Sequence, residues 1–146
     1  MDNVVPTNIL ILIDRVEPPA GLLDWIRSRA HQGATAFHLL MPDPAHAEVH
    51  VLHPERHDRA AVALRALHAS RSTYEAAAGA AVPMTASIRH DPFDAVERFL
   101  MTNTVDEIVV CVTHHALSDR LRHDVAHRLA HLHIPITDII PASMHA

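Results

Sequence analysis

The sequence predicts an α/β domain with an open, five-stranded parallel sheet sandwiched between helices. Short apolar runs alternate with helix-like segments along the chain, which favours right-handed β-α-β connections and hence parallel strands. The runs at 9–13 and 108–112 are continuous and rich in β-branched residues, as in strands that are buried on both faces. No linker or repeat divides the 146 residues, so residues 1–146 are expected to form a single domain.

The first two expected strands are separated by a helix whose limits are marked by breakers. Residues 8–13 (NILILI) form the first strand, and the prolines and glycine within 18–21 end it. Residues 22–30 carry leucine, isoleucine and alanine at helical spacing, and Gly33 lies where a helix C-cap belongs. Residues 36–41 (AFHLLM) form the second strand.

The middle of the chain is expected to add one long helix and a third strand. A single alanine-rich helix runs from Asp58, which can act as its cap, to about Ala78, where Gly79 ends it. Residues 82–88 alternate, which indicates a strand nearer an edge of the sheet. The pair Asp-Pro at 91–92 then opens the next helix as a cap and a first-turn proline.

The last part of the chain contributes two strands and the helix between them. Residues 107–112 (EIVVCV) are the expected fourth strand, and residues 136–140 are the fifth. Val125, Leu129 and Leu132 lie on the apolar side of the intervening helix. Ligands of parallel sheets bind at the carboxyl ends of strands, where the strand order reverses. If the order reverses between the first and fourth strands, the site is surrounded by Asp14, Arg15, Thr113, His114 and His115.

The composition excludes several classes of protein. The hydrophobic fraction is 49%, and the apolar runs are too short for a membrane-spanning helix. A single cysteine, Cys111, excludes an internal disulfide and a cysteine zinc finger; with no basic leader segment, the cytoplasm is the expected compartment. The formal charge of −5, without lysine or an arginine stripe, argues against nucleic acid at pH 7. No nucleophile elbow or phosphate loop occurs, so no enzymatic reaction is expected.

Five segments carry a family resemblance through their order and spacing. They are Asp14 at the end of the first strand, GLLDWI at 21–26, HDPFDAV at 90–96, DEIVVC at 106–111 and the stretch 125–136 before the last strand. In this order they resemble the universal stress protein family from residue 8 to residue 140. The resemblance implies the strand order 3-2-1-4-5 and a regulatory or binding module that acts in the stress response.

The nucleotide motif of that family is degenerate in this chain. Members that bind ATP carry Gly-x2-Gly-x9-Gly-Ser/Thr after the fourth strand, where the glycines let backbone amides approach the phosphates. Here Cys111 and His114 occupy the first two glycine positions, and His123-Asp124 replaces the Gly-Ser pair. Asp124 could cap the last helix and place a carboxylate where a phosphate would lie.

The resemblance therefore implies a member that does not bind ATP, although Asp14, at the position that recognises adenine, is retained. The positions that correspond to the nucleotide site are Asp14, Arg15, Cys111, Thr113, His114, His123 and Asp124.

The last strand is the expected partner surface. An apolar edge strand invites pairing, and members of the family commonly pair their last strands across a two-fold axis. The resemblance thus implies a homodimer, with a further protein partner that the sequence does not name. The interface would be formed by Ile134, Ile136, Asp138, Ile139 and Ile140. The alternative is a monomer whose tail, residues 142–146, shields this edge.

Two other functions stay open from the residues themselves. In the first, a rearranged loop over residues 113–124 binds a nucleotide, with Arg120 and Arg122 as phosphate partners. In the second, some of the 15 histidines form a metal or pH sensor, with zinc as the metal considered. The histidines at helical spacing are His46, His50, His53 and His57 in one segment and His123, His127 and His131 in another. His38 is expected to be a hydrogen-bonded residue of the core or the sheet edge, and Cys111 an inert, buried thiol.

Overall fold

The computed structural model describes residues 5–19, 21–42, 56–87, 92–113 and 115–139. These residues form one parallel sheet in the order β3-β2-β1-β4-β5, which confirms the predicted fold class and strand order. The strands are β1 (Thr7–Ile13), β2 (Thr35–Met41), β3 (Met84–Ala86), β4 (Glu107–Cys111) and β5 (Ile136–Asp138).

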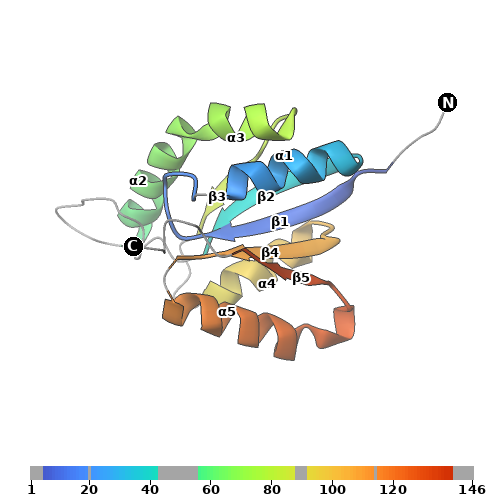
Figure 1. Ribbon diagram of the computed structural model, residues 1–146. Coiled ribbons are helices and arrows are strands. Elements are labelled where there is room, and N and C mark those ends of the chain that lie inside the picture. The colour runs from blue at the N-terminus through green and yellow to red at the C-terminus, as the bar shows by residue number, and fades with distance from the viewer. Residues whose placement is uncertain (1–4, 20, 43–55, 88–91, 114, 140–146) are drawn as a thin grey trace.

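Helices cover both faces of the sheet (Figure 1). One face carries α1 (Leu22–Gln32), α2 (Arg56–Ala69) and α3 (Arg71–Ala78), and the other carries α4 (Pro92–Thr102) and α5 (His115–Arg128). A 3-10 turn, Ala130–Leu132, leads from α5 towards β5. None of the helices within the described ranges is long and apolar enough to cross a membrane.

The core has two layers, one on each face of the sheet. Along β1, Ile9, Ile11 and Ile13 pack towards α1–α3, whereas Leu10 and Leu12 pack towards α4 and α5. Residues 9–13 are essentially inaccessible to solvent. A strand buried on both faces needs apolar side chains at every position rather than at alternate positions. This requirement explains the unbroken apolar run from which the strand was predicted.

The long helix predicted from Asp58 to Ala78 is wrong, because two helices occupy this segment. It is divided at Ser70, whose N–H donates to the Leu67 carbonyl in a 3-10 type bond of 2.9 Å. The Ser70 hydroxyl donates to the carbonyl of Val16, 3.2 Å away. A short polar side chain that finds a backbone partner outside the helix favours such a break. Asp58 is consequently not the cap, since α2 already begins at Arg56.

Several other limits differ from the prediction. The third strand is shorter than residues 82–88, and the fifth ends at Asp138 within the described residues. Leu132 is 44% exposed, because α5 ends at Arg128 and the 3-10 turn rotates Leu132 away from the apolar side. The predicted limits that involve residues 88, 91 and 140 lie outside the described part of the chain.

Candidate functional site

The carboxyl ends of β1 and β4 bring together Asp14, Arg15 and Thr113. The register pairs Ile13 with Cys111, so the residues that follow these two strands lie next to each other. The Thr113 N–H donates to Asp14 Oδ1 at 2.9 Å, and the Thr113 hydroxyl lies 3.0 Å from each Asp14 oxygen. Arg15 Nε donates to that hydroxyl oxygen, also at 3.0 Å. The sequence correctly placed these three residues at the point where the strand order reverses.

The Asp14 carboxylate is held by the chain itself. Its residue is only 2% exposed, and both of its oxygens lie within hydrogen-bond distance of Thr113. A buried carboxylate needs hydrogen-bond donors to offset the loss of hydration, and Thr113 supplies an amide and a hydroxyl for this purpose. Asp14 therefore joins β1 to the segment after β4.

Cys111 lies at the end of β4, beneath this cluster, and is fully buried. Burial first, and then the negative charges of Asp14 and Asp138, together raise the pKa of the thiol to about 12. The reactive form of cysteine is the thiolate, which is scarce at neutral pH in such surroundings. The structure thus agrees with the prediction of an inert thiol.

We expect Cys111 to resist thiol reagents in the folded protein. At pH 8, Ellman's reagent mixed with the folded protein should release almost no thionitrobenzoate within minutes. The thiol of Cys111 is both buried and protonated, so it does not react. The same sample in concentrated guanidinium chloride should react fully, which provides the internal control. Rapid stoichiometric reaction without denaturant would contradict the burial described for this residue.

The predicted role of Asp124 as a helix cap is wrong. Helix α5 begins at His115, with only three residues between it and the last residue of β4, so Asp124 lies well inside the helix. There it forms an i,i+4 ion pair with Arg120, whose Nε is 3.9 Å from Asp124 Oδ2. The backbone amides in the interior of a helix donate to carbonyls four residues earlier and cannot surround a phosphate. The carboxylate that lies close to the start of α5 is Asp14, through Thr113.

The loop predicted over residues 113–124 is therefore a helix for most of its length. The two arginines considered as phosphate partners lie on that helix. Arg122 contacts Asp119 one turn earlier and, through Nη1, Asp138 of β5 at 2.9 Å. Both arginines are thus engaged with carboxylates of the chain, and Arg122 joins α5 to the edge strand.

The predicted histidine clusters are only partly within the described residues. His123 and His127 are exposed on α5 and stack, with ring centroids 5.1 Å apart and 16° between the planes. His114 and the segment that contains His46, His50 and His53 lie outside the description, as do the side chains of His57, His115 and His131. Within the described ranges, no three histidine, cysteine or acidic side chains are grouped so that they could hold a metal ion.

His38 is a hydrogen-bonded residue of β2, as predicted. Its Nε2 lies 2.8 Å from the hydroxyl oxygen of Thr85 on β3, and its ring meets Phe99 of α4 edge-on. Burial lowers the pKa of this imidazole below 6.5, because the charged form loses hydration.

The lowered pKa of His38 predicts a loss of stability in acid. Its contribution is fully present above pH 6.5 and is lost as the pH falls through the lower pKa of the folded state. The free energy of unfolding, measured by urea denaturation, should therefore fall less between pH 7.5 and pH 5 in His38→Gln than in the wild type. The exposed His68→Gln variant should follow the wild type. Equal pH dependence of the wild type and His38→Gln would contradict the assignment.

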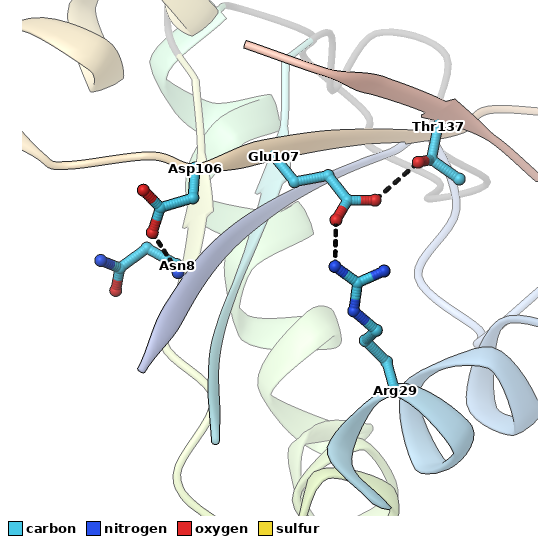
Figure 2. Close-up of polar contacts among 5 residues, drawn as sticks. All are labelled: Asn8, Arg29, Asp106, Glu107 and Thr137. Atoms are coloured by element: carbon cyan, nitrogen blue, oxygen red, sulfur yellow. Dashed lines mark hydrogen bonds and ion pairs between the residues drawn. The ribbon is translucent and has the colours of Figure 1, made fainter. Parts of the chain in front are cut away.

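The opposite end of the sheet holds a polar network that the sequence did not reveal. Glu107, the first residue of β4, accepts a hydrogen bond from Arg29 of α1 and another from the Thr137 hydroxyl of β5, both at 2.6 Å (Figure 2). Nearby, the Asp106 carboxylate accepts the Asn8 N–H at 2.8 Å. Only one signal was available, an acidic residue at the start of an otherwise apolar strand. This network fixes β5 at the sheet edge.

The predicted dimer residues belong to the edge strand and its flanks. Ile134 and Ile136 pack partly on the layer beneath α4 and α5, whereas Ile139 packs on the opposite layer. Asp138 is held by Arg122, and Ile140 lies outside the described residues. Pro135 and Ile139 hydrogen-bond to β4, through Ile108 N and Val110 O respectively. Because alternate residues of a strand direct their backbone groups to opposite sides, Ile136 and Asp138 direct theirs away from β4.

A scan of the chain against protein-family models finds no matching family, and a search of curated proteins finds no match. The likeness to universal stress proteins therefore remains a prediction from the sequence pattern.

Proposed function

We propose that this chain is a regulatory binding module of the universal stress protein type that works without ATP in the cytoplasm. The observation that carries the proposal is the start of α5 at His115, directly after β4. Phosphate binding at this edge of the sheet in the manner of the family requires a long glycine-containing loop with free amides. The connection between β4 and α5 has three residues and none of them is glycine.

The charges at this edge support the same proposal. The Asp14 carboxylate is buried and bonded to Thr113, two residues before α5 begins, and a phosphate in the family's manner would be attracted by the positive end of this helix dipole. Two anionic groups at that position repel each other. Of the arginines considered for this edge, Arg15 donates through Nε to the Thr113 hydroxyl, and Arg122 is engaged with Asp119 and Asp138.

Thermal melting tests this proposal. Millimolar ATP with magnesium should leave the melting temperature unchanged, because only a ligand that prefers the folded state raises it. Magnesium sulfate at equal ionic strength is the control. A rise in melting temperature that grows with ATP concentration and is lost in Asp14→Asn would overturn the proposal.

We also propose that the module is a homodimer paired through β5. This strand is at the sheet edge, and within the described residues its backbone pairs only with β4. Outward-facing N–H and C=O groups of an edge strand are a template for pairing with another strand. Two-fold symmetry would make the pairing antiparallel, and an axis at Thr137 would place Ile136 opposite Asp138 of the second copy.

Asp138→Pro tests the dimer through one backbone group. Proline removes the outward N–H, and edge strands tolerate proline where no ladder bond is lost. Asp138→Asn is the matched control, since it loses the ion pair to Arg122 but keeps that N–H. Light scattering should give a dimer for the wild type and Asp138→Asn, and a monomer for Asp138→Pro. A monomeric wild type, or a dimeric Asp138→Pro, would refute pairing through β5.

A metal sensor is the second candidate, and the stacked pair of His123 and His127 favours it. Two imidazoles one helical turn apart can share a transition metal ion, although two ligands give only a weak site. Zinc binding measured by calorimetry should fall in His123→Ala and stay unchanged in His68→Ala. Equal zinc binding by the two variants would remove this candidate.

A further inference from the structure

A groove lies between β2, β3 and α4, and it extends from the amino ends of β1 and β2 to the carboxyl end of β3. On one face of the sheet β3 packs against α2, whereas on the opposite face α4 and α5 pack against side chains of β1, β2 and β4. Two adjoining hollows of about 360 and 400 Å³ remain on that opposite face. They share His38, Phe99 and Asn103 and therefore adjoin at these residues, and we refer to the two hollows together as the groove. Volumes of this size suit a small molecule.

The centre of the groove is aromatic. The His38 and Phe99 rings have centroids 4.4 Å apart and planes inclined at 68°. The bond between His38 Nε2 and the Thr85 hydroxyl oxygen fixes the imidazole, and Leu40 and Ala95 add apolar surface. Edge-to-face geometry leaves ring surface on which a third aromatic ring can pack.

The rim of the groove is polar and carries one positive charge. Arg98 of α4 lines it, is exposed, and forms no ion pair within the described part of the chain. The Thr102 hydroxyl and the Asn103 amide donate to carbonyls of the last turn of α4, at 3.0 to 3.4 Å. These bonds cover carbonyl oxygens that would otherwise repel an anion at the end of the helix.

We propose that this groove binds a small aromatic carboxylate. The ring of the ligand packs against His38 and Phe99, and its carboxylate pairs with the Arg98 guanidinium, which is suited to bidentate recognition of a planar anion. Thr85 adds a hydroxyl on the β3 side. The site shares no residue with the cluster of Asp14, Arg15 and Thr113, so it is independent of the proposed absence of ATP binding.

Benzoate is the probe for this site, and benzamide is its uncharged counterpart. Titration of the labelled full-length protein, followed by two-dimensional amide NMR, should give saturable benzoate shifts confined to β2, β3 and the end of α4. Arg98→Gln should weaken benzoate binding about five- to tenfold, because a charge-assisted pair is lost at a partly solvated rim. Benzamide should bind more weakly than benzoate, and its affinity for Arg98→Gln should stay within about twofold of its affinity for the wild type.

Arg71→Gln is the control, because Arg71 is also an exposed arginine and lies on α3, on the opposite side of the sheet. It should bind benzoate as the wild type does. Shifts that are absent, unsaturable or centred on Thr113 would overturn the proposal. Equal benzoate affinity of Arg98→Gln and Arg71→Gln would overturn the role of Arg98.

Discussion

Replacing Glu107 with alanine is expected to lower the free energy of unfolding by about 3 kcal/mol, as measured by urea denaturation. The carboxylate is buried and receives short hydrogen bonds from Arg29 and Thr137. Its removal leaves a half-buried guanidinium and a hydroxyl without their acceptor and opens a cavity between α1, β4 and β5. The loss is therefore larger than the value of a surface ion pair, which is about 0–1 kcal/mol.

Glu107→Gln separates charge from hydrogen bonding in this network. The amide oxygen still accepts one bond, so we expect roughly half of the alanine effect. Glu97→Ala, an exposed change on α4, should alter stability by less than about 0.5 kcal/mol. If Glu107→Ala were as mild as Glu97→Ala, the network would not hold β5 to the sheet.

Replacing Asp14 with alanine is the second change with a large expected effect, a loss of about 2–3 kcal/mol. The Thr113 N–H and hydroxyl would lose their acceptor at a nearly buried position, where water does not replace it fully. The bond between the end of β1 and the segment after β4 would be lost with it. Denaturation in urea, with the slope checked for two-state behaviour, measures this change.

Asp24→Ala is the matched control for Asp14. The Asp24 carboxylate is 84% exposed and pairs with Arg27 on the surface of α1, so its loss should cost less than about 0.5 kcal/mol. The loss of unfolding free energy in Asp14→Asn should lie between the losses in Asp14→Ala and Asp24→Ala, because the amide oxygen can still accept a hydrogen bond from Thr113. An Asp14→Ala protein as stable as Asp24→Ala would show that the carboxylate is free to serve a ligand.

The elements that could be predicted were those with strong local signals. The unbroken apolar runs identified β1 and β4, since only a strand buried on both faces needs them. The division of α2 from α3 could not be predicted, because it depends on a bond from Ser70 to Val16, which is distant in sequence. The start of α5 was misplaced because the family motif was aligned through His123 and Asp124, although the intervening residues are compatible with a helix.

The cluster at the carboxyl ends of β1 and β4 could be predicted in part, because these two strands have strong local signals. Asp14, Arg15 and Thr113 follow strands, and topology alone brings the ends of adjacent parallel strands together. The bonds from Thr113 to Asp14 and the pairing of Arg122 with Asp138 depend on side-chain directions that periodicity does not give. The groove beside His38 was also missed. It depends on where α4 lies over the sheet, and no sequence signal specifies that placement.

Calorimetric titration of the protein with ATP and magnesium, near pH 7.5 and at moderate salt, tests the central claim most directly. The account predicts no saturable heat up to millimolar ATP, because α5 begins where a phosphate loop would be needed and Asp14 is already bonded to Thr113. Titration into buffer alone corrects for dilution. A saturable exotherm with a micromolar dissociation constant would contradict the account and show that this edge of the sheet rearranges to hold phosphate.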